Sequence, residues 1–123
     1  MQNIQTKGIT YTGLAMRLIA TERMLKGLDQ QVLADALGVN KSSYSRLETG
    51  QTALTVDALF VLCRALGLSP VSLLTRVEAL SAEAASHPEL MVTPHGAQQN
   101  SGVAELVTGA ALGALITAML TKR

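Results

Sequence analysis

The sequence predicts an all-α chain: a compact domain of five short helices, followed by a linker and a hydrophobic C-terminal helix. Three observations predict this fold class. In residues 1–80, apolar residues recur at helical spacing, and no stretch alternates apolar and polar residues for long enough to indicate a strand. Glycines and capping residues separate these apolar segments, as they do at the ends and starts of helices. The 123 residues suffice for one domain and an appendage.

The composition excludes several classes of protein. Hydrophobic residues make up 48% of the chain and charged residues 15%, which excludes a disordered chain and indicates a sizeable core. The single cysteine, Cys63, excludes an intramolecular disulfide and a cysteine metal cluster, and favours a reducing cytosol. Residues 1–13 lack the apolar core of an export signal, so we expect no export. The net charge of +1 averages a mildly basic N-terminal part and a slightly acidic C-terminal part.

The first two helices are predicted from their caps and their apolar spacing. The first helix begins near Thr10 or Thr12 and ends at Gly27, and its inward residues are Leu14, Ala15, Leu18, Ile19 and Leu25. Asp29 is a suitable N-cap for the second helix, and Gly38 ends it. The inward residues of this second helix are Leu33, Ala34 and Leu37.

The next three helices follow from the same signals. Asn40 caps the third helix, which carries the inward pair Tyr44 and Leu47 and ends at Gly50. The fourth runs from about Thr55 to Leu66 and ends at Gly67, with Val56, Leu59, Cys63 and Leu66 on one face. Ser69 and Pro70 form the start of the fifth helix, and Val71, Leu74 and Val77 share a face.

The C-terminal part of the chain has a different composition. Residues 81–102 contain two of the three prolines and no sustained apolar period, which predicts a linker that begins with a helical turn or two. Residues 106–121 carry no charge. We therefore divide the chain into a domain at 10–80, a linker at 81–102 and a hydrophobic helix at 103–123.

Two of the predicted helices meet at the short turn Gly38-Val39-Asn40, which is the layout of a helix-turn-helix. The residues around this turn resemble those of the phage-repressor-like (Xre/Cro-type) DNA-binding family. The resemblance lies in Gly27-Leu28-Asp29-Gln30-Gln31-Val32-Leu33-Ala34, in Leu37-Gly38-Val39, in Ser45-Arg46-Leu47-Glu48-Thr49-Gly50, and in the spacing of leucines through the fourth and fifth helices. It covers about residues 11–75 and implies a five-helix domain whose third helix enters the DNA major groove.

The resemblance and the helix positions together give a set of candidate DNA-binding residues. Gln30 lies in the first turn of the second helix, where free backbone N–H groups favour phosphate, and the family uses a glutamine there to hold phosphate. By resemblance, Lys41 and Ser42 reach bases and Ser43 reaches phosphate or sugar. Arg46 shares their face and can contact guanine or phosphate. The full candidate set is Gln30, Asn40, Lys41, Ser42, Ser43, Arg46, Thr49 and Gln51.

A second implied feature is an ion pair between Arg23 and Glu48. In the family, an arginine near the end of the first helix pairs with a glutamate at the matching position, so this pair is expected to fix the first helix against the third. The alternative is two solvated charges, which contribute only about 0–1 kcal/mol. Two departures from the family pattern bear on this surface: Asp29 adds a negative charge near the phosphate-facing end, and the hydroxyl of Tyr44 needs a partner or a path to solvent.

The C-terminal segment 103–123 predicts a helix with no polar face, so we expect it to be buried against another surface. Small residues at Gly109 and Gly113 permit close helix–helix approach, with Leu112, Leu115, Ile116 and Met119 on the opposite side. Three interpretations remain open: homo-oligomerisation, burial against this domain or a protein partner, and membrane insertion. A helix of sixteen residues is about 24 Å long, short of the ~30 Å hydrocarbon core of a bilayer.

Together these features predict a sequence-specific, double-stranded DNA-binding transcription regulator. We expect a dimeric repressor in a bacterial or phage-type cytoplasm, associated with the nucleoid. The alternative is a protein-interaction module, such as an antitoxin or a membrane-associated adaptor, whose C-terminal helix binds a partner or a membrane. The sequence contains no nucleophile–base–acid set and no metal-ligand spacing, so neither an enzyme nor a cofactor or metal is expected.

Overall fold

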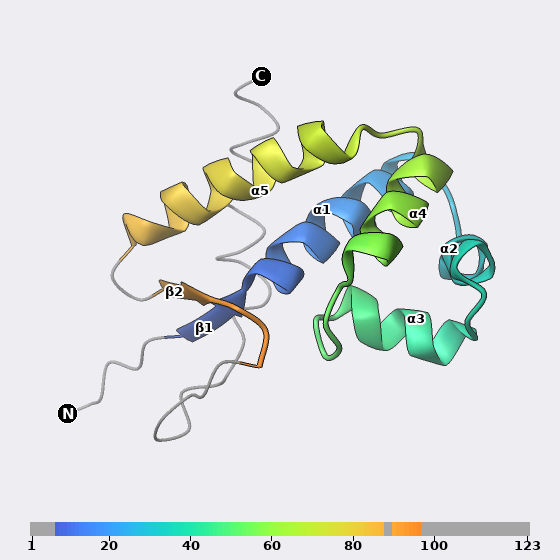
Figure 1. Ribbon diagram of the computed structural model, residues 1–123, viewed down its shortest axis with the longest axis horizontal. Coiled ribbons are helices and arrows are strands. Elements are labelled where there is room, and N and C mark those ends of the chain that lie inside the picture. The colour runs from blue at the N-terminus through green and yellow to red at the C-terminus, as the bar shows by residue number, and fades with distance from the viewer. Residues whose placement is uncertain (1–6, 88–89, 97–123) are drawn as a thin grey trace.

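A computed structural model describes residues 7–87 and 90–96 of the chain. Along these residues the chain forms one short strand, then five helices, then a second short strand (Figure 1). The elements are β1 (Lys7–Thr10), α1 (Tyr11–Leu25), α2 (Gln30–Leu37), α3 (Lys41–Glu48), α4 (Val56–Leu66), α5 (Pro70–Ala85) and β2 (Leu90–Thr93). Helix α5 packs along α1, while α2 and α3 lie at the end of the molecule away from the strands. The predicted helical domain, with its five helices in the predicted order, is confirmed.

Side-chain caps fix where the helices begin. The hydroxyl of Thr10 accepts from the backbone N–H of Gly13 at 2.8 Å, and Oδ1 of Asn40 accepts from the N–H of Ser43 at 2.7 Å. Thr55 and Ser69 cap α4 and α5 in the same way. Each cap satisfies a backbone donor that the first helical turn leaves without a partner. Asp29 is the N-cap residue of α2, as predicted, but its side chain makes no capping hydrogen bond.

The helix ends are equally local. Gly38 and Gly67 adopt left-handed conformations, with φ of 73° and 71°, at the C-caps of α2 and α4. An L side chain rarely adopts this conformation, so these two glycines allow the chain to leave each helix and start the next. At Gly38 the result is the short turn that joins α2 to α3.

The core is built from the faces of all five helices. Its fully buried aliphatic residues include Leu14, Leu18, Leu33, Leu62 and Leu80. Tyr44 is also fully buried, and so is the thiol-bearing Cys63. Most of the residues predicted to face inward are buried. The prediction was possible because residues three and four apart on a helix face the same side.

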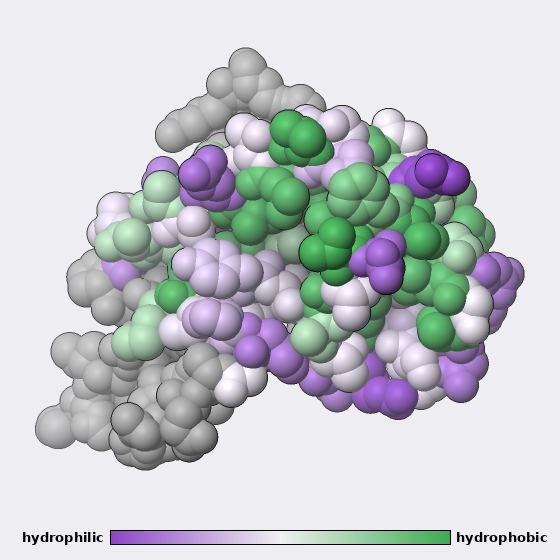
Figure 2. Space-filling model, in the orientation of Figure 1, coloured by the Kyte–Doolittle hydropathy of each residue, from purple (hydrophilic) through white to green (hydrophobic). Residues whose placement is uncertain are grey.

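Leu25, which was expected to face inward, is 70% exposed. Val56, Val71 and Leu74, which were predicted to share a face with apolar residues that are buried, are 70%, 73% and 47% exposed. The buried face of α5 is made by Leu73, Val77, Leu80 and Ala84, so its true stripe is rotated from the predicted one. Leu25 and Val56 occupy terminal helical positions beyond the packed turns. Figure 2 shows that apolar side chains gather over α4 and the neighbouring part of α5.

The sequence indicated no strand in residues 1–80, and this prediction is wrong, because Lys7–Thr10 form β1. Strands β1 and β2 pair in parallel, with Ile9 aligned with Val92 and Thr10 with Thr93. Ile9 is 2% exposed and Val92 packs against the core, so one side of this small sheet extends the core beside α5. Four-residue strands carry too little alternation to be recognised, and this pairing depends on contacts between distant parts of the chain.

The predicted linker at 81–102 has more structure than expected in its described part. Residues up to Ala85 continue α5, in agreement with the helical turn or two predicted there, and Leu90–Thr93 form β2. Strand β2 in this segment was not predicted. The predicted helix at 103–123, with Gly109, Leu112, Gly113, Leu115, Ile116 and Met119, lies outside the described residues.

No single helix of the described part is both long and apolar enough to cross a membrane. Helices α4 and α5 pass that test only when taken together, and the chain bends by 110° between them.

Candidate nucleic-acid interface

Helices α2 and α3 contact each other across the turn at Gly38, Val39 and Asn40. The backbone N–H of Val39 donates to the carbonyl of Ala34 at 3.0 Å, and the N–H of Tyr44 donates to the carbonyl of Asn40 at 3.0 Å. One helix therefore ends and the next begins within three residues. Because Tyr44 and Leu47 are buried, α3 presents its opposite face to solvent.

That solvent face carries a polar and basic row. Lys41, Ser42 and Arg46 are exposed, and Ser43 is half-buried. The guanidinium of Arg46 donates to the hydroxyl of Ser42 at 3.1 Å and to that of Ser43 at 3.3 Å. These bonds hold a planar cation along the first turns of α3. An arginine held in this way can donate two parallel hydrogen bonds to a guanine edge or to a phosphate.

Lys41 and Asp29 lie at the N-terminal ends of α3 and α2. Lys41 Nζ is 3.6 Å from Asp29 Oδ1, and both side chains are more than half exposed. The carboxylate offsets the unfavourable position of a cation at a helix N-terminus. An exposed pair of this kind contributes little to stability, so Lys41 can leave Asp29 for another partner at small cost.

Glu48 lies behind this row, where one carboxylate receives four hydrogen bonds. Arg23 donates to it from Nε at 2.9 Å and from Nη2 at 3.1 Å. Gln30 Nε2 donates at 2.6 Å and the hydroxyl of Tyr44 donates at 2.7 Å. The expected contact between Arg23 and Glu48 is thus present, and it joins α1, α2 and α3 at one point.

The surroundings shift three titrations in this cluster. Burial alone would raise the pKa of Glu48, but the hydrogen bonds from Arg23, Gln30 and Tyr44 outweigh it and leave that pKa below its ordinary value. Burial, reinforced by the bond to Glu48, raises the pKa of Tyr44. The bond to Glu48 also raises the pKa of Arg23. At neutral pH the carboxylate is ionised and the phenol is a hydrogen-bond donor.

Arg23 and Gln30 are each held by a hydrogen bond that limits how they can meet DNA. Nη1 of Arg23 donates to the carbonyl of Leu28 at 2.7 Å, in the segment between α1 and α2. Gln30 is half-buried, and its amide nitrogen already has Glu48 as an acceptor. A phosphate contact by Gln30 must therefore use the second hydrogen of the same amide group.

The last two candidates lie just beyond α3. Thr49 and Gln51 are exposed on either side of Gly50, and Nε2 of Gln51 donates to the Thr49 hydroxyl at 3.0 Å. The Thr49 hydroxyl itself donates to the backbone carbonyls of Ser45 and Arg46. Both side chains belong to the loop between α3 and α4 and continue the polar edge that begins at Lys41.

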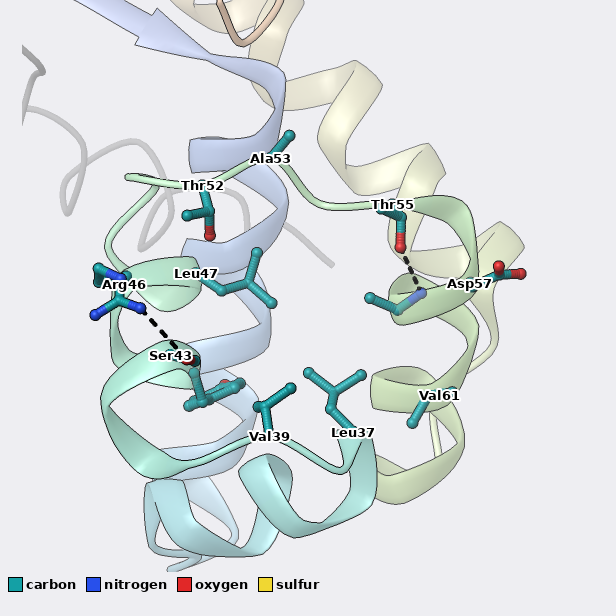
Figure 3. Close-up of a pocket in the computed structure, with 12 residues that line it drawn as sticks. Leu37, Val39, Ser43, Arg46, Leu47, Thr52, Ala53, Thr55, Asp57 and Val61 are labelled. Carbon is teal, nitrogen blue, oxygen red and sulfur yellow. Dashed lines mark hydrogen bonds between the residues drawn. The ribbon is translucent and has the colours of Figure 1, made fainter.

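A hollow of about 470 Å³ separates α3 from α4 beside this edge (Figure 3). Leu37, Val39, Leu47 and Val61 form its apolar wall, and Ser43 and Arg46 lie on the α3 side. Figure 3 also shows that the carboxylate of Asp57 points away from the hollow.

The structure brings most of the candidate residues onto one side of α3 and its two flanking turns. That surface contains Asn40, Lys41, Ser42 and Ser43, and Arg46 joins it through its bonds to the two serines. Thr49 and Gln51 extend it. The side chain of Gln30 bonds Glu48 and so belongs to the Glu48 cluster. The pair Asp29–Lys41 and the bond between Tyr44 and Glu48 were not predicted. The unexplained hydroxyl of Tyr44 was the one sequence signal for the second of them.

No group of three or more histidine, cysteine, aspartate or glutamate side chains is arranged to hold a metal ion in residues 7–87 and 90–96.

Comparisons with known proteins agree with this geometry. Residues 19–73 match the family model described as Helix-turn-helix. The chain is also similar to the crystal structure of the clp gene regulator ClgR from C. glutamicum, at 26% sequence identity and a TM-score of 0.52. The match covers 56% of this chain and 90% of that one. No curated protein matches the chain.

Proposed function

Because residues 19–73 form a helix-turn-helix domain of the repressor-like (Xre/Cro) type, we propose that this protein is a sequence-specific, double-stranded DNA-binding transcription regulator. The coarser conclusion, a DNA-binding regulator, is supported by the domain and by the similarity to a gene regulator. In this proposal the protein binds DNA and catalyses no reaction. It acts in the cytoplasm, bound to the chromosome.

The observation that carries the proposal is the exposed start of α3. Its surface presents Lys41, Ser42 and Arg46 to solvent, and the guanidinium of Arg46 is held by two serine hydroxyls. The Glu48 cluster fixes the angle of α3 against α1 and α2. Base readout needs such a rigid helix, because its side chains must keep their register against the base edges.

We assign separate roles to the candidate residues. Lys41, Ser42 and Arg46 contact base edges, while Gln30, Asn40, Ser43, Thr49 and Gln51 contact the sugar-phosphate strands. Phosphate contacts hold the protein in register, and base contacts choose the sequence. The side-chain oxygen of Asn40 already caps α3, so its amide nitrogen is the group that donates to DNA.

We further propose that the protein is a repressor and binds as a dimer. A single small domain with a modest positive charge binds DNA weakly, and two copies on half-sites about 34 Å apart gain avidity. Bound at a promoter, such a dimer excludes the polymerase. Residues 103–123 remain a predicted oligomerisation helix, and deleting them separates this role from partner or membrane binding.

The test is to map the binding sites across the genome, footprint one of them, and measure two variants on it. Arg46→Ala is expected to cost about 1–3 kcal/mol and to relax the base preference. Gln30→Ala is expected to weaken binding to all sequences alike. If both variants bind the footprinted site as the unchanged protein does, this surface is not the DNA interface.

A further inference from the structure

Helix α4 exposes one continuous face. Its exposed residues come in pairs, and the residues between these pairs pack towards the core. The exposed residues are Val56, Asp57, Phe60, Val61, Arg64 and Ala65. The buried residues are Leu59, Leu62, Cys63 and Leu66. One half of the helix surface is therefore packed, and the other half is open to solvent.

The open half of α4 is unusually apolar. Val56 is 70% exposed, Phe60 55% and Val61 37%. Figure 2 shows the apolar side chains over α4 as part of a surface that continues onto α5, where Val71 and Leu74 are also exposed. Soluble domains rarely leave large apolar patches in water, and such patches mark contact surfaces.

The two charged residues of this face lie at equal distances on either side of the midpoint between Phe60 and Val61. Asp57 lies three positions before Phe60, and Arg64 lies three positions after Val61. These are the only charges in α4, and they lie two turns apart, about 10.5 Å along the helix. An acidic end and a basic end therefore flank an apolar centre.

This pattern is complementary to itself. If two copies of α4 pack antiparallel about a two-fold axis at the midpoint, Phe60 and Val61 of both copies meet at the centre. Asp57 of each copy then comes level with Arg64 of the other, which forms two equivalent ion pairs. A two-fold interface requires this property, since the same patch must match itself.

Asp57 and Arg64 have no ion-pair partner in the described part of the chain, residues 7–87 and 90–96. Figure 3 shows the Asp57 carboxylate directed outward from the body of the domain.

Two hollows border the α4 ridge and provide space for side chains of an opposing helix. The first, between α3 and α4, is about 470 Å³, and the second, beside Ala36, Phe60 and Arg64, is about 440 Å³. Val61 lines both of them. Helices pack by placing the ridge of one into the grooves of the other, so this face offers both parts.

We propose that the exposed face of α4 is the surface on which a second copy of this chain docks, antiparallel and two-fold symmetric, through Asp57, Phe60, Val61 and Arg64. This goes beyond the proposed function, which requires two copies on DNA but does not say which faces meet. Two helices of eleven residues bury less than the ~1,200 Å² of a standard stable interface, so the contact is weak alone and strengthened on DNA.

The experiment is thiol crosslinking of the full chain without DNA, with Val61→Cys as the reporter. The matched control is Ala82→Cys, at an exposed position on the far part of α5. Cys63 is buried and does not compete for the reagent. A short thiol-to-thiol crosslinker is expected to join two copies through position 61 at least about tenfold faster than through position 82, because symmetry brings position 61 next to its own counterpart.

Charge reversal then tests the pairing itself. In the Val61→Cys background, Asp57→Arg makes the face all positive and Arg64→Asp makes it all negative. Each variant alone is expected to crosslink about tenfold more slowly, because both symmetry-related pairs become repulsive. A mixture of the two variants is expected to regain the original rate, because opposite faces then meet. Thermal melting of each variant confirms that it is folded.

Two outcomes overturn the proposal. One is crosslinking at position 61 no faster than at position 82 over the whole soluble concentration range. The other is a mixture that crosslinks no faster than its separate components. Neither outcome bears on the proposed function, because DNA binding by the same variants is measured separately.

Discussion

The guanidinium of Arg23 donates to both carboxylate oxygens of Glu48, at 2.9 Å to Oε2 and 3.1 Å to Oε1, and so joins the end of α1 to the end of α3. The side chains of Arg23 and Glu48 are only 13% and 9% exposed. Two-point contact and burial distinguish this pair from a surface ion pair, because the geometry is fixed and solvent screens it little.

Glu48→Gln is expected to lower the free energy of unfolding by about 2 kcal/mol. The substitution keeps the shape but removes the charge that Arg23 faces, and an unpaired cation with little access to water is costly. Urea denaturation measures the change. Asp35→Asn is the control, since Asp35 is exposed and bonds only Gln31 among the contacts seen, so its effect should stay within about 0.5 kcal/mol. Equal effects of the two substitutions would contradict a structural role for Glu48.

Tyr44→Phe is expected to cost about 1 kcal/mol, because it removes one of four donors from the carboxylate and leaves the buried ring in place. The double variant with Glu48→Gln should cost less than the sum of the single variants, because both act on the same hydrogen bond. Additive costs in a denaturation series would mean that the hydroxyl and the carboxylate act independently.

The stability of the domain should depend on pH through Glu48. Its pKa is lower in the folded protein than in the unfolded chain, so the folded state binds fewer protons over that interval. The stabilisation is present above the unfolded value of about 4.3 and disappears as pH falls through the folded value. Thermal melts between neutral and acidic pH measure it. Glu48→Gln should flatten that dependence, and an unchanged slope would show that other groups cause it.

Asp29→Asn is expected to strengthen DNA binding several-fold for all sequences. Asparagine is as good an N-cap as aspartate, and the carboxylate makes no capping bond here, so α2 should be unaffected. The change removes a negative charge 3.6 Å from Lys41, at the edge proposed to face DNA. Titration of a labelled duplex measures the affinity, with Asp35→Asn as the charge-matched control. Equal gains from both substitutions would indicate a general charge effect.

Lys41→Gln is expected to weaken binding to the footprinted site and to leave the slope of log affinity against log salt unchanged, because the proposed contact is to a base edge rather than to a phosphate. A salt slope reduced by about 1 would instead assign the ammonium group of Lys41 to a phosphate. The titration is repeated at several salt concentrations, because an affinity at one concentration cannot separate the two roles.

The helix boundaries could be predicted from the sequence because they depend on neighbouring atoms. Asn40 caps the backbone of Ser43, three residues away, and Gly38 needs only its own left-handed conformation. Strands β1 and β2 could not be predicted, since the partner of Ile9 is Val92, far along the chain. The exposed side of α5 was misjudged for a related reason: its apolar residues permit two stripes, and packing against α1 selects one.

The candidate site divides in the same way. Helical spacing places Arg46 on the same face as Ser42 and Ser43. The roles of Lys41, Ser42 and Ser43 and the pair Arg23–Glu48 were expected through a family resemblance. The contacts Asp29–Lys41 and Gln30–Glu48 depend on the angle between α2 and α3, which no local pattern encodes.

The central claim is that the α3 surface reads base sequence, and the ratio of two affinities tests it most directly. The dissociation constant is measured at physiological salt for the footprinted site and for a shuffled duplex of the same length. Sequence-specific regulators bind their sites at least about 10³-fold more tightly, and this protein should do the same, with the ratio falling in Arg46→Ala. A ratio near one for the unchanged protein would contradict sequence-specific recognition.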